Sequence, residues 1–291
     1  MKKTIVFTFL LIFTAASAFA TNQIDSLLWE LDKTVKNRYI YSEEREAQIK
    51  DLKDRLKSVP ENDEIKYSIY GELFELYKNY QMDSALFLAN TRIAIAERSG
   101  IQAQHMTASM NLAEVLIGTG MYKEAFDILD NQSRNVQSIE VLTYRYHLYH
   151  SLYVLMADYS ITEKQKQENE LLAVQYKDSI LSVLSEDVIG YHMVRTTRLL
   201  AENRTDEALK IGLNCFQTFG VNNQSIAMSA YTLSEVFNMT GKREEEKKYL
   251  IISALGDIRG AVKEYISLRA LAVMLYEDGD IGRAYDYTKC A

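Results

Sequence analysis

Residues 112–129 read Leu-Ala-Glu-Val-Leu-Ile-Gly-Thr-Gly-Met-Tyr-Lys-Glu-Ala-Phe-Asp-Ile-Leu. The apolar residues before Gly120 recur with the spacing of an α-helix, and the same spacing begins again after it. Glycine readily adopts the left-handed backbone conformation that ends a helix, so Gly120 predicts a turn. Ala125 is small enough to let the second helix approach the first closely. The stretch therefore predicts an antiparallel pair of helices.

The same register returns four more times along the chain. Each copy has an apolar helix, a turn residue and a second helix, and in three of the four a small residue lies near the start of the second helix. The copies cover residues 73–85, 196–208, 233–250 and 271–284, with Tyr80, Asn203, Gly241 and Gly279 at the turn position and Ala85, Ala208, Glu246 and Ala284 at the small position. Five copies in one register make a chance set of unrelated helical hairpins improbable, so we predict a repeat protein.

The pattern of small, apolar and turn residues resembles the tetratricopeptide repeat (TPR). Ala85 and Ala125 are 40 positions apart, and Ala208, Glu246 and Ala284 follow one another at 38, so these hairpins are about one helical turn longer than the standard repeat of about 34 residues. The 83 positions from Ala125 to Ala208 leave room for one further, degenerate hairpin. We therefore predict an all-α fold, a tetratricopeptide-like right-handed α-solenoid of antiparallel helix pairs, with about five to six repeats over residues 63–291 and the last one incomplete.

The N-terminal residues have the pattern of an export signal. Lys2 and Lys3 precede a short apolar stretch, residues 4–13, and Ala18-Phe19-Ala20 has the spacing of small residues at a signal-peptide cleavage site. We expect residues 1–20 to be a signal peptide, with the mature chain on the periplasmic face of the cell envelope. An uncleaved membrane anchor is the alternative, and the short apolar stretch disfavours it because a membrane span needs about 20 apolar residues.

Two apolar stripes with helical spacing follow the leader, one in residues 24–35 and one in residues 49–59. We interpret residues 21–62 as an N-terminal helical pair that caps the solenoid. Pro60 is the chain's one proline, and it should end this pair because the residue before a proline disfavours the helical conformation. At the other end, Ala291 lies about three turns into a helix. We expect either a longer natural protein or a partner that covers this end.

The charge balance and the missing motifs exclude several functions. The formal net charge is −7, and cleavage of a leader with two lysines and no acid makes it more negative. An acidic chain repels phosphate backbones, so we expect no nucleic acid to contact this segment. No apolar run after the leader is long enough for a membrane span, so membrane attachment would need sequence beyond residue 291.

No pattern in the chain predicts catalysis. A phosphate-binding glycine loop and a nucleophile elbow are both missing. His147 and His150 lie on one helix with a spacing that suits a metal, but no third ligand has a suitable spacing. We therefore expect no enzymatic activity, no cofactor and no bound metal.

The degenerate hairpin holds the strongest candidate for a binding surface. Residues 141–159 contain five of the chain's twenty tyrosines, and tyrosine gives rigid contact area with a polar tip, as interfaces favour. Most of the tyrosines fall at core positions of the repeats. The hypothesis is that the concave groove of the solenoid is lined by Tyr144, His147, His150 and Ser151.

Four short segments resemble a family of bacterial envelope proteins of unassigned function. They are Leu31-Asp32 with Arg38 and Tyr41, residues 120–125, Tyr176-Lys177-Asp178-Ser179, and residues 264–269. Members of that family carry a signal peptide, long tetratricopeptide repeats, one membrane helix, a coiled coil and a DNA-binding region. The resemblance covers essentially the whole chain and implies the periplasmic sensor portion of a membrane-anchored transcriptional regulator. The membrane helix and DNA-binding region lie outside this sequence, and the resemblance assigns no functional residues.

The sequence thus favours a helical repeat module that binds a partner. We expect the partner to be a protein or peptide, with a glycan fragment and a second copy of the chain (a homodimer) left open. The alternative is a non-signalling scaffold or assembly factor in the cell envelope.

Overall fold

The computed structural model describes residues 23–60, 62–132, 138–263 and 265–291. Every regular element in these ranges is an α-helix, as the repeat pattern predicts. A first helix covers residues 23–36. It is followed by α2 (Arg38–Ser58), α3 (Asp63–Tyr77), α4 (Met82–Ser99), α5 (Gln102–Gly118), α6 (Tyr122–Asp130), α7 (Ile139–Asp158), α8 (Glu163–Val183), α9 (Ile189–Ala201), α10 (Thr205–Phe219), α11 (Asn223–Met239), α12 (Arg243–Arg259), α13 (Ile266–Glu277) and α14 (Ile281–Cys290).

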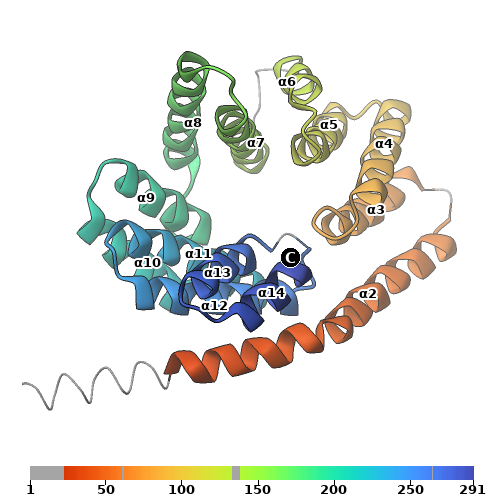
Figure 1. Ribbon diagram of the computed structural model, residues 1–291. Helices are drawn as coiled ribbons and strands as arrows, with labels where there is room; N and C mark the ends of the chain where they lie inside the picture. The colour runs from red at the N-terminus through yellow and green to blue at the C-terminus, as the bar shows by residue number, and fades with distance from the viewer. Residues whose placement is uncertain (1–22, 61, 133–137, 264) are drawn as a thin grey trace, which may run out of the picture. The chain divides into compact units, whose positions relative to one another are not determined.

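The chain divides into two compact units, and the larger one comprises residues 43–211. Its helices pack as successive antiparallel hairpins, α3 with α4, α5 with α6 and α7 with α8, and each hairpin lies against the next one (Figure 1). The small residues Ala85 and Ala125 are fully buried where the paired helices meet. Asn62 caps α3, because its side chain accepts a hydrogen bond from the backbone N–H of Ile65 at 3.1 Å. This arrangement confirms the tetratricopeptide-like fold.

The turn residues behave as their chemistry predicts. Gly120, Asn203, Gly241 and Gly279 all have positive φ angles, between 59° and 84°. In each hairpin the next residue's N–H bonds back to a carbonyl five positions earlier, as from Met121 to Leu116 at 2.8 Å. Tyr80 occupies the same position in the α3–α4 hairpin but cannot adopt this conformation cheaply. That turn instead closes with a bond from the Gln81 N–H to the Tyr77 carbonyl at 2.8 Å.

These turns make a first prediction. Gly120→Ala should lower the free energy of unfolding by about 1 kcal/mol, because a β-carbon is strained at a φ of 81°. Asn203→Gly should leave stability unchanged or raise it slightly, since it removes such a β-carbon. Gly282→Ala is the matched control, as Gly282 has neither a positive φ nor a tight contact at its Cβ position. Urea denaturation of the three variants measures this, and equal losses for Gly120→Ala and Gly282→Ala would refute the assignment of strain.

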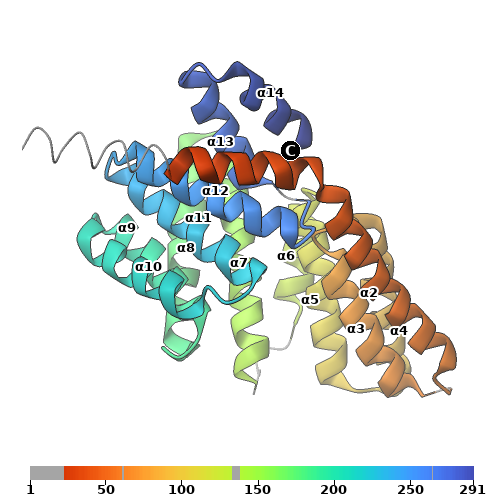
Figure 2. The ribbon, with the colours of Figure 1, turned by 90° about the horizontal axis from the view of Figure 1, so that it is seen from below.

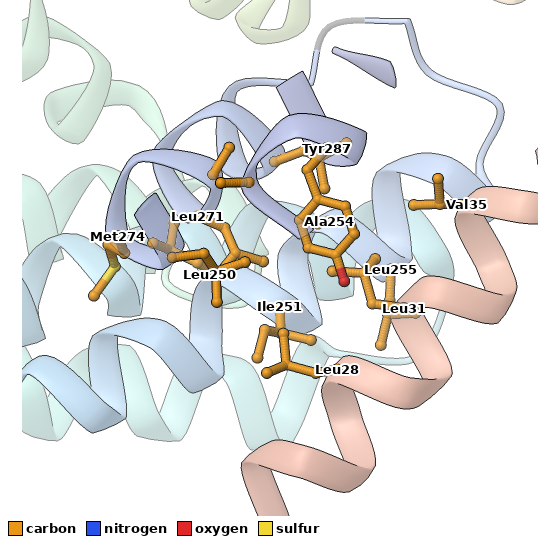
Figure 3. Close-up of a cluster of buried hydrophobic side chains, with 14 of the residues drawn as sticks. Leu28, Leu31, Val35, Leu250, Ile251, Ala254, Leu255, Leu271, Met274 and Tyr287 are labelled. Carbon is orange, nitrogen blue, oxygen red and sulfur yellow. The ribbon is translucent and has the colours of Figure 1, made fainter. Parts of the chain in front are cut away.

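The smaller unit comprises residues 23–42 among the described residues, together with residues 212–291. The hairpins α11–α12 and α13–α14 pack side by side, and the first helix lies across α12, α13 and α14 (Figure 2). Leu28, Leu31 and Val35 of the first helix enter the same core as Ile251 of α12 and Tyr287 of α14 (Figure 3). Residues more than two hundred positions apart thus share one hydrophobic core.

Polar contacts fix the first helix in this position. The Asp32 carboxylate accepts a hydrogen bond from the Tyr287 hydroxyl at 2.6 Å and pairs with the Arg283 guanidinium at 3.0 Å. Glu30 pairs with Arg259 of α12 at 2.5 Å. The Asp32 side chain is partly buried, so these bonds are stronger than ion pairs on an open surface.

The predicted N-terminal helical pair is not formed as we expected. The apolar stripe of residues 24–35 packs on the last two hairpins, whereas Ile49 and Leu52 of α2 share a core with Leu73 and Phe74 of α3. The two stripes therefore belong to different units and do not form one cap over residues 21–62. Helical spacing shows that a face is apolar, but it does not show which surface will cover it. The end of α2 at Ser58, two residues before Pro60, agrees with the prediction.

Candidate ligand-binding site

The four predicted groove residues all lie on α7. Ser138 caps this helix, since its side-chain oxygen accepts a hydrogen bond from the Val141 N–H at 3.4 Å. Tyr144, His147 and Ser151 are three and seven positions apart, which places them on one face of α7. His150 points toward α8, where its Nδ1 lies 3.0 Å from the Ala173 carbonyl oxygen. The structure turns Tyr144 toward α5, through its bond to Glu114, and His150 toward α8.

Tyr144 already has partners within the protein. Its hydroxyl donates to the Glu114 carboxylate at 2.5 Å and accepts from the Asn111 side chain at 3.1 Å. Burial, followed by the charge of Glu114, raises the pKa of Tyr144 well above its ordinary value. These contacts join α5 to α7 and indicate a structural role for this hydroxyl.

Burial favours the neutral form of both histidines. Burial, with a smaller contribution from Lys177, lowers the pKa of His150 to about 4, and burial also lowers the pKa of His147. Within the described residues there is no group of three histidine, cysteine or acidic side chains that could hold a metal ion. Ser151 is exposed. The role of these residues in a groove stays a prediction.

A buried arginine lies next to the Tyr144 contacts. Arg92 of α4 donates a hydrogen bond from Nη1 to the Asn111 side chain, and its guanidinium lies 4.2 Å from the centre of the Tyr67 ring. Gly71 gives it room, because a β-carbon there would lie 3.1 Å from the guanidinium carbon. Among the described side chains, Arg92 Nε is one of the buried polar atoms without a partner. Asn111 therefore links a buried cation to Tyr144 across three hairpins.

The other tyrosines of α7 form a stack with α8. The rings of Tyr149 and Tyr176 lie 4.7 Å apart and nearly parallel, and Tyr153 stacks on Tyr176 at 5.7 Å. Tyr149 and Tyr153 are buried, which confirms that these two tyrosines occupy core positions. Offset aromatic pairs of this kind add about 0.5–1.5 kcal/mol each to the burial of their surface. The stacked rings hold α7 and α8 together, and we call this hairpin with its stacked tyrosines the α7–α8 platform.

A pocket of about 620 Å³ opens beside this platform, between α6, the end of α7 and the start of α8. Its apolar wall is made of four aromatic rings and a methionine: Tyr122, Phe126, Tyr153, Tyr159 and Met156. Polar groups border it from the start of α8 and from α6: Ser160, Gln165, Glu168, Asn169 and Lys123. An apolar pocket with a few polar groups at its edge is the usual form of a small-ligand or side-chain site.

Two large side chains at this pocket are exposed to solvent. Tyr159 is 73% exposed and Ile161 is 96% exposed, although both are large and apolar. The rings of Tyr159 and Tyr122 face each other with centroids 6.1 Å apart. Exposed aromatic surface at the mouth of a pocket gives a partner a contact area that costs little conformational entropy.

Sequence reasoning identified only part of this pocket. Tyr153 and Tyr159 belong to the tyrosine-rich segment, and Tyr122 belongs to the repeat pattern. Gln165, Glu168 and Asn169 lie in the polar segment of residues 160–170, which no binding motif marks in the sequence. The signal that could have found them is their spacing of three and four positions along α8, which puts polar groups on the face beside the tyrosines.

Most of the chain matches a known protein family. Residues 35–291 match the model of the SusR N-terminal TPR domain. The chain belongs to this family. The matched stretch thus covers α2 to α14 and the end of the first helix from position 35 on. No match is found among curated protein sequences.

Family membership and fold agree on a coarse function. A solenoid of TPR-type hairpins is a module that binds proteins or other ligands, and domains of this type are generally not catalytic. Within the described ranges, no helix is both long enough and apolar enough to cross a membrane. The chain is therefore a helical repeat module of a type that binds proteins or other ligands.

Proposed function

We propose that this protein is the periplasmic sensor portion of a membrane-anchored transcriptional regulator, and that its ligand binds in the α6–α8 pocket. The observation that supports this most is the match of residues 35–291 to a domain that is N-terminal in SusR. An N-terminal binding module suits a protein that detects a ligand with one part and acts with another. The resemblance of the sequence to envelope regulators points the same way.

The leader supports the proposed location. Residues 1–20 have the charge, apolar stretch and small-residue spacing of a signal peptide, and they lie outside the described residues. The first described helix begins at residue 23, after the expected cleavage site. Cleavage before Thr21 would keep every described residue of that helix in the mature chain.

The α6–α8 pocket supports ligand binding by its size and lining. It is large enough for a peptide side chain or a small organic ligand, and its walls offer aromatic faces with amide and carboxylate groups at the edge. Tyr153 lines the pocket and stacks on Tyr176, and a side chain that is already held in place lowers the entropic cost of binding. A short peptide or a glycan fragment would find both apolar contact and hydrogen-bonding partners there.

Calorimetric titration with a panel of short peptides and oligosaccharides tests the proposal. We expect one class to bind, and Tyr159→Ala to weaken that binding at least tenfold, because Tyr159 supplies exposed ring surface at the pocket. Its exposure means that folding should be unaffected. Tyr39→Ala is the matched control, since Tyr39 is also exposed (57%) but lies on α2. Equal loss in both variants, or no binding by any panel member, would contradict the assignment of the pocket.

A further inference from the structure

The α6–α8 pocket offers several aromatic rings to whatever it binds. Tyr122 and Phe126 come from α6, Tyr153 comes from α7, and Tyr159 directly follows α7. The rings of Tyr122 and Tyr159 are tilted by 32° with their centroids 6.1 Å apart. The face of an aromatic ring carries partial negative charge, so it attracts a cation that lies within about 6 Å of its centre. Several such rings around one space favour a positively charged occupant.

Within the described residues, no lysine or arginine of the protein lies over these four rings. The cation–π pairs of the described chain involve other rings, such as Tyr67 under Arg92 at 4.2 Å. Lys123, the base at the edge of the pocket, pairs instead with Asp127 one turn further along α6. The ring faces of the pocket are therefore left for a cation that the ligand brings.

The charged side chains around the pocket are mainly acidic. Acids outnumber bases by three to one in α6 and by two to one in residues 158–170. Glu168 lies in the pocket wall, and its nearest base, Lys164 at 3.8 Å, forms only an exposed and weak pair with it. Burial and the nearby Asp158 carboxylate raise the pKa of Tyr122, so this negative charge acts on a ring of the pocket. The surroundings favour a cation and disfavour an anion.

The start of α8 also borders the pocket but does not reverse this field. The first backbone N–H groups of a helix carry a partial positive charge. The Thr162 side chain caps one of them by accepting from the Gln165 N–H at 3.3 Å, and Glu163 adds a carboxylate in the first turn. Both features offset the positive end of the helix dipole.

The lining suits an organic cation on a peptide better than a metal ion. The rings and the Met156 side chain offer few of the oxygen ligands that hard metal ions need. At the edge, the Asn169 amide donates to Ser160 at 3.2 Å and the Gln165 amide accepts from Thr162 at 3.0 Å. The opposite ends of these two amides, one acceptor and one donor, match the N–H and C=O groups of a peptide backbone.

We propose that the α6–α8 pocket binds the positively charged side chain of a lysine or arginine in a basic peptide. This inference rests on the proposed function and names the chemical class of its ligand. The methylene groups of the side chain pack against Met156 and the aromatic edges, while its charged end lies over the ring faces near Glu168. The peptide backbone pairs with Gln165 and Asn169. The excess of acids around the pocket attracts such a peptide before contact is made.

Calorimetric titration of the purified protein with charged peptides and their neutral isosteres tests the inference. The probes are short peptides with blocked ends and one sequence, whose central residue is arginine, citrulline, lysine or acetyl-lysine. Citrulline and acetyl-lysine keep most of the shape and lose the charge. We expect a charged peptide to bind at least tenfold more tightly than its neutral isostere, because several ring faces attract the charge. High salt should weaken only the charged peptides.

Two variants locate the effect in the pocket. Tyr159→Leu keeps an apolar side chain but removes a ring face, so it should weaken the charged peptide about two- to fivefold and leave the neutral one nearly unchanged. Glu168→Gln should weaken the charged peptide about threefold. Glu170→Gln is the matched control, because Glu170 is exposed on the same helix but does not line the pocket. All three side chains are exposed, so circular dichroism should show an unchanged helical fold.

The outcomes separate this inference from the proposed function. Charged and neutral peptides that bind equally well, with both weakened by Tyr159→Ala, would overturn the cationic ligand and leave the pocket assignment in place. Binding of a neutral oligosaccharide alone at this pocket would do the same. Equal losses from Glu168→Gln and Glu170→Gln would also overturn the inference, since the charge effect would not then come from the pocket. No binding by any peptide or oligosaccharide up to about 10 mM would overturn both proposals.

Discussion

Leu31→Ala should destabilise the smaller unit by about 2–5 kcal/mol, which is the usual cost of emptying a leucine site in a core. Leu31 is fully buried between α12 and α14, although it lies on a helix at the other end of the sequence (Figure 3). Its replacement leaves a cavity beside Ile251 and Tyr287. Urea denaturation, followed by the fluorescence of the one tryptophan, Trp29 on the same helix, measures the loss.

The matched control for this prediction is Leu171→Ala. Leu171 lies on α8 and is 60% exposed, so its removal should change stability by less than about 0.5 kcal/mol. If Leu31→Ala had an equally small effect, the first helix would not be an integral part of the core that contains α12–α14.

Asn111→Ala should lower stability by about 2–3 kcal/mol, because it leaves charged and polar groups of the larger unit without their partner. Arg92 donates to the Asn111 oxygen, and Tyr144 accepts from the Asn111 amide. Arg92 is buried and its Nε already has no partner among the described residues, so the guanidinium cannot recover the lost bond from its surroundings. Thermal or urea denaturation of the variant measures the effect.

Asn90→Ala provides the comparison for this second prediction. Asn90 is exposed on α4, and its amide donates to the carbonyl of Leu86 in the same helix. Its replacement should change stability by less than about 0.5 kcal/mol. Similar losses in the two variants would show that the buried arginine does not depend on Asn111.

The hairpins could be predicted because each rests on local chemistry. Gly120 and Gly279 mark turns through their backbone freedom, and Ala125 marks a close helix contact through its size, so neighbours in the sequence decide the outcome. The turn at Tyr80 departs from the pattern because a tyrosine there disfavours the left-handed conformation. The family resemblance found in the sequence is confirmed by the match over residues 35–291.

The contacts of the first helix could not be predicted in the same way. Its apolar stripe is visible in the sequence, but its partners, Ile251 and Tyr287, are more than two hundred positions away. Charge pairs at that separation, such as Asp32 with Arg283, leave no periodic signal. Part of the α6–α8 pocket was also missed. A pocket forms where the ends of different helices meet, and the residue pattern within one helix does not show where that is.

The measurement that tests the central claim most directly is the reading of the natural gene beyond the codon for Ala291. A sensor portion of a membrane-anchored regulator predicts a membrane-spanning segment, followed by a region with the helix-turn-helix pattern and basic charge of a DNA-binding domain. A stop codon at that point, or a continuation made only of further repeats, would contradict the regulator and favour a scaffold in the cell envelope.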